Sequence, residues 1–257
     1  MKLLTSTFKM LLTKEKEVRA VILNIDPITG DLIAQVNNQR AIIAPKNISM
    51  YEAYGNEDSN VKRLLGSTIH ANVIGRDNKN IILSRRDLMQ RQFETHQVGD
   101  IVEATVQSFA DNAMYLQFGE GLIGKMYTNQ ITSAKVEKPI DLYNIGDIVK
   151  CRIVKKQADG RFQLSRLSYY KNRENINIEC GNILKCKITQ KLHENSGYFV
   201  EVMSDPNYSG IFDINKHNCN RKYRVGDTLN LRVVDVKSRN QLRFRTNLTT
   251  TESKKCC

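Results

Sequence analysis

The sequence has few of the residues that build metal centres, disulfide frameworks or membrane spans. It holds six cysteines and four histidines among 257 residues, and no two cysteines form a C-x-x-C pair. One histidine and one cysteine lie close together, at His217 and Cys219, without a second pair at zinc-finger spacing. No apolar run is long enough to cross a bilayer. We therefore expect no metal, no membrane partner and a reducing, cytoplasmic location.

Positive charge is what the sequence has in excess. Lysine and arginine total 39 against 27 acidic residues, which gives a formal net charge of +12. A basic surface attracts polyanions, because its side chains neutralise phosphates and release the counterions bound to them. The expected partner is a nucleic acid. Charge alone leaves open a solvated basic surface that has no partner.

Three glycine-led segments recur at a fixed interval along the chain. Gly66, Gly146 and Gly226 are each 80 residues apart. Each glycine opens a strand of alternating apolar and polar residues, which is followed by a short turn and a second strand. A regular period of this kind indicates one unit built three times rather than a single large fold.

Alternation within each unit predicts five short strands. In the middle unit we expect them at residues 101–109, 113–118, 122–128, 148–154 and 162–164. Five half-buried strands in about 70 residues suit a small closed barrel of OB type. The predicted fold class is all-β, with three tandem five-stranded OB-type barrels, short helical connectors and a short N-terminal helix.

The predicted boundaries follow from these units. Leu4, Phe8, Leu11 and Leu12 share one helical face, which predicts an amphipathic helix. The expected segments are an N-terminal helix at 1–16, barrels at 17–87, 98–167 and 180–247, a helical linker at 88–97, a second linker at 168–179 and a flexible tail at 248–257.

Five segments of the middle unit form an ordered motif series. They are Gly99-Asp100-Ile101-Val102, Ala113-Met114-Tyr115-Leu116-Gln117-Phe118, Gly124-Lys125-Met126-Tyr127, Gly146-Asp147-Ile148-Val149 and Gly160-Arg161-Phe162-Gln163-Leu164-Ser165. This series resembles the S1-type RNA-binding domain family. The third unit matches less fully and the first is divergent, so the resemblance covers about residues 17–247. The order of units is similar to that of multi-barrel ribosomal proteins of the small subunit.

Period-two geometry places Tyr115, Lys125 and Tyr127 on the outer side of the middle unit. Adjacent strands lie ~5 Å apart, so the two rings are expected on one surface, where aromatic faces stack on bases. The resemblance implies that these two ring positions bind single-stranded RNA and that Arg161 contacts its backbone. The other basic residues predicted to bind RNA here are Lys150 and Arg152. An ordinary barrel surface is the alternative.

The third unit keeps one ring, Phe199, and has Asp213 at the second ring position. A carboxylate beside phosphates is unfavourable, so weaker stacking is expected here. Basic residues that alternate with core residues offer compensation, and we expect this unit to act mainly as an electrostatic clamp. These residues are Lys185, Lys187, Arg232, Arg243 and Arg245.

The first unit has apolar residues where rings are expected, at Ile33 and at Ala44 or a neighbour. No stacking surface is predicted there. An apolar patch on this side suits a protein contact or packing against the next barrel.

Two phosphate-loop patterns overlap at Gly119-Glu120-Gly121-Leu122-Ile123-Gly124-Lys125. A phosphate loop needs Ser or Thr next and a helix after it, whereas Met126 follows and a strand is predicted. No carboxylate cluster recurs elsewhere. The sequence therefore predicts no nucleotide or other cofactor, no small-molecule substrate and no catalytic residues.

Together these features predict a non-enzymatic protein that binds single-stranded RNA with little sequence preference. By resemblance it acts in translation and holds mRNA near the small ribosomal subunit, which it contacts through residues 1–87. The alternative is a regulatory or interaction module that acts in transcription or RNA turnover through protein partners.

Overall fold

The structure, a computed structural model, describes residues 17–51, 61–77, 79–171, 177–192, 196–213, 223–238 and 240–246. The expected N-terminal helix at 1–16 and the tail at 248–257 lie outside these ranges, as do His217 and Cys219. In the part of the chain that is described, no helix is both long and apolar enough to cross a membrane.

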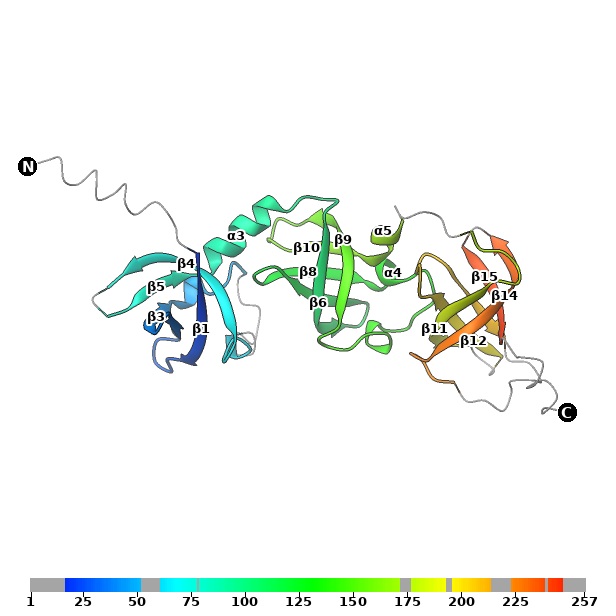
Figure 1. Cartoon of the computed structure of the whole chain (residues 1–257), viewed down its shortest axis with the longest axis horizontal. Coiled ribbons are helices and arrows are strands. Elements are labelled where there is room, and N and C mark those ends of the chain that lie inside the picture. The colour runs from blue at the N-terminus through cyan, green and yellow to red at the C-terminus, as the bar shows by residue number, and fades with distance from the viewer. Residues whose placement is uncertain are drawn as a thin grey trace, which may run out of the picture. The chain divides into compact units, whose positions relative to one another are not determined.

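The first barrel closes in the order β1-β2-β3-β5-β4 (Figure 1). Its elements are β1 (Glu17–Ile25), β2 (Leu32–Val36), β3 (Gln39–Ile43), the 3₁₀ turn η1 (Pro45–Asn47), β4 (Thr68–Arg76) and β5 (Ile81–Ser84). Neighbouring strands are antiparallel except β3 and β5, which are parallel. Helix α3 (Arg86–Thr95) follows the last strand.

The middle barrel has the same cyclic order, β6-β7-β8-β10-β9. Its elements are β6 (Ile101–Ala110), β7 (Ala113–Phe118), β8 (Leu122–Tyr127), helix α4 (Thr128–Ile131), the 3₁₀ turn η2 (Pro139–Asp141), β9 (Ile148–Lys156), β10 (Phe162–Ser165) and helix α5 (Arg166–Tyr170). Every strand begins where the sequence predicts and ends within two residues of the predicted end. A strand, β8, follows the glycine-rich turn, as expected.

The third barrel repeats the order again, as β11-β12-β13-β15-β14. Its strands are β11 (Ile183–Lys191), β12 (Gly197–Val202), β13 (Ser209–Asp213), β14 (Thr228–Ser238) and β15 (Gln241–Thr246). The predicted fold class of three tandem five-stranded OB-type barrels is therefore confirmed.

The repeated glycines close each barrel by one hydrogen-bond pattern. The N–H of Gly146 donates to the carbonyl of Val106 at 2.9 Å, and the Val106 N–H donates to Asp147 at 2.9 Å. Gly66 and Gly226 make the same bond to Ile22 and Ile188. All three glycines have φ between 74° and 96°, where an L side chain is strained. This shared geometry explains why a glycine recurs at the same point of each barrel.

Each barrel has its own core of alternating inward side chains. In the middle barrel Val106, Leu116, Cys151 and Ile153 are completely buried. Aliphatic residues fill the core of the first barrel, and aliphatic and aromatic residues together fill that of the third. The opposite, outward set of residues on these strands is therefore available for contacts with other molecules or barrels.

The chain forms two compact units. One contains the first barrel, α3 and residues 119–122 and 158–160, and the other contains the rest of the middle barrel and the third barrel. The second unit holds all the residues that the sequence predicts to bind RNA.

Candidate RNA-binding surface

The outward face of β7 and β8 brings together Tyr115, Lys125 and Tyr127, which we call the tyrosine platform. The two strands are hydrogen-bonded neighbours. Their inward residues Met114, Leu116 and Met126 are buried, so period two turns the platform residues outward. All three platform residues remain half-exposed.

The ammonium group of Lys125 contacts both rings of the platform. Its Nζ lies 4.6 Å from the centroid of the Tyr127 ring and 5.7 Å from that of Tyr115. At these distances a cation is attracted to the ring face. The platform thus offers two aromatic faces for bases and one mobile cation for a phosphate.

Arg161 lies beside the platform. Gln163 on β10 pairs with Lys125 on β8, and Arg161 is two residues earlier, so both point to the same side. Its carbonyl accepts a hydrogen bond from the N–H of Gln157 at 2.8 Å, which closes the turn between β9 and β10.

The two other basic residues predicted in this barrel have different surroundings. Lys150 forms an ion pair with Glu103 at 3.0 Å, and both side chains are more than half exposed. Such a surface pair is weak and a phosphate can replace the carboxylate. Arg152 instead donates to the carbonyls of Gly99 and Ser168. It holds α5 near the start of the barrel, so its guanidinium group already has a structural role.

Four basic residues of the third barrel share one outward face, which we call the basic surface. Arg232 on β14 lies opposite Arg245 on β15. Lys185 on β11 pairs with Asn230 on β14, on the same side. Arg243 lies further along β15, opposite Asp235. The side chains of Lys185, Arg232, Arg243 and Arg245 are all exposed.

Lys187 is separated from the basic surface and faces the middle barrel. Its Nζ donates to the carbonyl of Leu142 at 2.6 Å and lies 5.4 Å from the Tyr143 ring. Burial lowers the pKa of this ammonium, although the Glu201 carboxylate opposes the effect. Lys187 therefore joins two barrels, a role that its place in a strand did not reveal.

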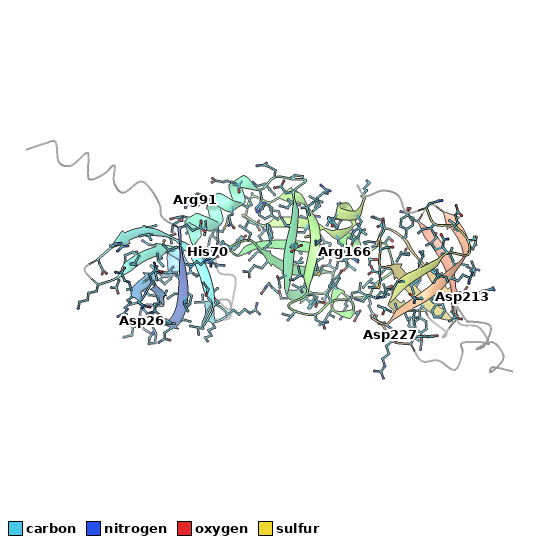
Figure 2. The ribbon with its side chains drawn as sticks, viewed as in Figure 1. Asp26, His70, Arg91, Arg166, Asp213 and Asp227 are labelled. Atoms are coloured by element: carbon cyan, nitrogen blue, oxygen red, sulfur yellow. The ribbon has the colours of Figure 1, made fainter. Side chains whose placement is uncertain are left out.

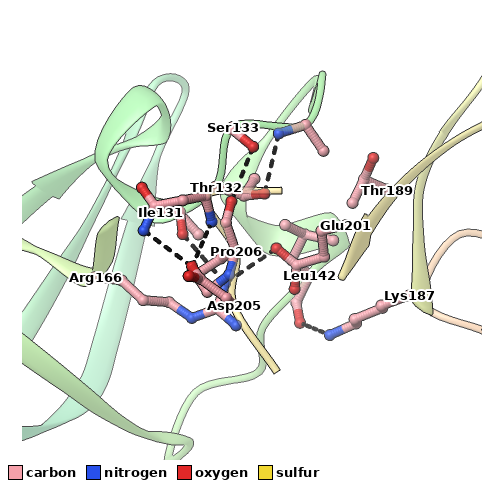
Figure 3. Close-up of polar contacts among 12 residues, drawn as sticks. Ile131, Thr132, Ser133, Leu142, Arg166, Lys187, Thr189, Glu201, Asp205 and Pro206 are labelled. Atoms are coloured by element: carbon pink, nitrogen blue, oxygen red, sulfur yellow. Dashed lines mark hydrogen bonds and ion pairs between the residues drawn. The ribbon is translucent and has the colours of Figure 1, made fainter. Parts of the chain in front are cut away.

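A buried ion pair anchors the same contact between barrels (Figure 3). Arg166, at the start of α5, donates from Nη1 to Glu201 on β12 at 3.0 Å and to the carbonyl of Ile131 at 3.1 Å. Burial lowers the pKa of this guanidinium, but the Glu201 carboxylate together with Tyr143 and Tyr170 raises it overall. Figure 2 labels Arg166 on the middle barrel. We call this contact, with Lys187, the barrel interface.

Lys135 is a candidate binding residue that the sequence did not predict. It lies on the long connection between β8 and β9, and its Nζ is 5.7 Å from the ring centroid of Phe199 on β12. Strand periodicity assigns no direction to a residue in such a connection. The pairing with Phe199 depends on how two barrels pack, and no local signal in the sequence marks it.

Among its described residues, the first barrel has no aromatic platform. Ile33 on β2 is half-buried and pairs with Ile42 on β3. On the neighbouring β1, Val21 and Leu23 are 39% and 56% exposed. This outward face is apolar, and we call these four residues the apolar face.

Comparison with known proteins identifies the middle barrel. The family model for the S1 RNA binding domain matches residues 95–167. Small ribosomal subunit protein bS1 of Leuconostoc lactis is 26% identical over 238 residues, which cover 83% of this chain and 52% of that protein. The bS1 homolog of Bacillus subtilis is also 26% identical, over 82% of this chain and 58% of its own length.

A relative with a different name matches a smaller share of its own length. The 4-hydroxy-3-methylbut-2-enyl diphosphate reductase of Clostridium acetobutylicum is 25% identical over 80% of this chain and 33% of that protein. The chain thus spans about half the length of the ribosomal relatives and a third of the reductase. The middle barrel thus matches the model of the S1 RNA binding domain, and the other two barrels share its topology.

Proposed function

We propose that this chain binds single-stranded RNA with little sequence preference and without catalysing a reaction. The observation that carries the proposal is the position of the Lys125 ammonium against the rings of Tyr115 and Tyr127, on the outward face of an S1 domain. Every base has an aromatic face, so stacking on such rings tolerates any sequence.

The basic surface of the third barrel supports the same proposal. Lys185, Arg232, Arg243 and Arg245 add positive charge that attracts a phosphate backbone without reading bases. Arg161 and Lys150 extend this charge around the middle barrel. Arg152 and Lys187 contribute mainly by holding α5 and the barrel interface in place.

We further propose that the protein acts in translation in the cytoplasm, where it holds mRNA near the small ribosomal subunit. The similarity to bS1 proteins supports this role. Residues 1–87 would supply the ribosome contact, because the apolar face of the first barrel suits a protein partner better than a nucleic acid.

Two measurements test this function with the full-length chain. Fluorescence anisotropy should give tighter binding to a labelled single-stranded RNA than to a duplex of the same length. Co-sedimentation with ribosomes at moderate salt tests the role in translation. Equal affinity for both RNAs would remove the stacking argument. RNA binding without co-sedimentation would favour a regulatory module that acts through other partners.

Metal-dependent degradation of RNA is the readout that tests the absence of catalysis. Purified protein incubated with labelled RNA should leave it intact with or without a divalent metal. Strand loss that persists after Tyr127→Ala and Arg161→Ala but needs the metal would contradict a purely binding role.

A further inference from the structure

Phe199 of the third barrel occupies the place that Tyr115 has in the middle barrel. Each is the third residue of the second strand of its barrel and follows a buried residue, Tyr198 or Met114. Each has a lysine Nζ 5.7 Å from its ring centroid. The two lysines come from different places. Lys125 belongs to the adjacent strand of the same barrel, whereas Lys135 belongs to the neighbouring barrel.

The third barrel has no lysine of its own at the matching position. Gly124-Lys125 on β8 corresponds to Gly210-Ile211 on β13, and Ile211 pairs directly with Phe199. Two residues further, Asp213 replaces the second ring. These three positions therefore carry one ring, one aliphatic side chain and one carboxylate, and the third barrel's own cation beside them is Arg243, which pairs with Ile211 from β15.

The chain positions Lys135 over Phe199 through a residue buried between the two barrels. The hydroxyl of Thr189 lies 2.8 Å from the carbonyl of Lys135 and 3.2 Å from that of Phe199. Thr189 is 1% exposed and sits in the β-bulge of β11, between Ile188 and Gln190. A bulge redirects a side chain relative to the regular strand. Here it turns the hydroxyl toward both carbonyls.

Further hydrogen bonds fix the segment that carries Lys135. Ser133 donates to the carbonyl of Pro206 from its backbone N–H at 3.0 Å and from its hydroxyl at 2.9 Å. The Arg166–Glu201 ion pair holds Ile131 in the same region (Figure 3). The backbone of Lys135 is thus held in place while its side chain stays exposed.

We propose that Lys135 and Phe199 form a second binding site for single-stranded RNA, which exists only while the middle and third barrels are packed together. A base stacks on the Phe199 ring and the adjoining phosphate pairs with the Lys135 ammonium. The proposal rests on the proposed function and adds to it. The third barrel would stack a base on its own ring, and its neighbour would provide the cation for the phosphate.

The site has a consequence for the length of RNA that the chain prefers. An RNA strand that is long enough to reach both the tyrosine platform and the second site is bound at two places by one protein molecule. Its second contact is therefore intramolecular. A strand of about four nucleotides, near the lower end of an OB-barrel footprint, can occupy one site at a time. The affinity for RNA should therefore rise steeply once the RNA is long enough to reach both sites.

The test uses the full-length protein and fluorescein-labelled oligouridines of about 4 and about 24 nucleotides. Lys135→Ala and Phe199→Ala should each weaken binding of the long strand about fivefold or more, by the usual size of a stacking contact. The double substitution should weaken it by clearly less than the product of the two, because both residues serve one site. Lys79→Ala removes an exposed lysine of the first barrel, where no stacking surface is predicted, and is the charge control.

A second pair of variants separates the site from folding effects. Phe199→Leu keeps an apolar side chain and should bind as weakly as Phe199→Ala. Thr189→Val keeps the side-chain volume but removes the hydroxyl that positions Lys135, so it should reduce affinity for the long RNA. Adding Tyr127→Ala to this variant should still weaken RNA binding, because the tyrosine platform is unchanged. Lys135→Ala should lower the salt slope by about 0.7, the value for one phosphate contact on a single strand.

The outcomes distinguish this site from the proposed function. If Tyr127→Ala weakens binding while Lys135→Ala and Phe199→Ala leave it unchanged, the second site is wrong and the function stands. If the effects of the two substitutions multiply fully, or if Lys79→Ala causes an equal loss of affinity, the composite site is also overturned. If the unchanged protein fails to bind single-stranded RNA, both proposals fall.

Discussion

Arg166 and Glu201 form an ion pair of 3.0 Å in which their side chains are only 12% and 4% exposed. Arg166 follows the last strand of the middle barrel and Glu201 lies on the second strand of the third. Removing one partner of a buried pair leaves the other charge without compensation. We therefore expect this pair to stabilise the packing of the two barrels, together with the hydrogen bonds of Lys187 and Ser133.

Replacing Glu201 should strongly destabilise the barrel interface. Glu201→Ala leaves the Arg166 guanidinium buried without its carboxylate, which typically costs about 3–5 kcal/mol. Calorimetric unfolding of the full chain should show a lower transition temperature. Glu103→Ala, which breaks the exposed pair with Lys150, is the control and should cost at most about 1 kcal/mol. Equal effects of the two substitutions would contradict the structural role of the buried pair.

Loss of the Tyr127 ring should weaken RNA binding. Tyr127→Ala is expected to cost at least about 1 kcal/mol of affinity for single-stranded RNA, by the size of a base–ring contact. Tyr127→Phe keeps the aromatic face and should bind like the unchanged protein. Anisotropy titrations of the three proteins provide the measurement. A loss in Tyr127→Phe as large as in Tyr127→Ala would assign the effect to the hydroxyl group instead.

Charge removal on the basic surface should change the salt dependence of binding. The double substitution Lys185→Ala with Arg243→Ala removes two candidate phosphate contacts, each worth about 0.7 in the slope of log K against log salt for a single strand. Titrations at several salt concentrations should give a slope that is flatter by about 1.4. An unchanged slope would show that these residues do not contact RNA.

Buried cysteines should make stability fall at alkaline pH. Burial raises the pKa of the Cys151 and Cys186 thiols from 9.0 to about 12. The folded state then binds more protons than the unfolded state above pH 9, so this stabilisation is complete below that pH and is lost as the pH rises toward 12. Urea unfolding at pH 8 and pH 10.5 gives the loss of stability between these two pH values. This loss should be smaller for the double variant Cys151→Ala with Cys186→Ala than for the unchanged protein. An identical loss in both proteins would contradict this assignment.

The repeated glycine should resist substitution for backbone reasons alone. Gly146 has φ of 96°, and a Cβ placed there would meet no atom within 4 Å. Gly146→Ala should therefore destabilise the middle barrel by about 1 kcal/mol through strain rather than collision. Gly75→Ala is the matched control, because its φ is outside the left-handed region and its Cβ would make ordinary contact with Ile82 at 3.9 Å. Thermal unfolding of both variants is the measurement.

The apolar face of the first barrel should matter for ribosomes and not for RNA. Leu23→Ser replaces a 56% exposed apolar residue on β1 and is expected to reduce ribosome co-sedimentation at unchanged RNA affinity. Ile148→Ser changes a 69% exposed residue of the middle barrel and serves as the control. A parallel loss of RNA affinity in Leu23→Ser would contradict the proposal that the first barrel contacts the ribosome while the other two bind RNA.

The local sequence pattern was sufficient to predict the barrels and the tyrosine platform. Tyr115, Lys125 and Tyr127 alternate with buried residues on two adjacent strands, so their shared face follows from the pleat. The period of the glycines likewise follows from a backbone that only glycine adopts easily. These features depend on neighbours in the same strand or hairpin, and a single sequence carries that information.

The amino-acid sequence thus determined by itself the number of barrels, their strands and the aromatic surface of the middle barrel. Tertiary structure alone decided that Lys187 and Arg152 bond to backbone carbonyls and that Lys135 lies over Phe199. It also decided that Arg166 meets Glu201. The physical reason is that packing between barrels joins segments 35 to 64 positions apart. The alternation of apolar and polar residues along a strand does not indicate which outward faces of the barrels will contact each other.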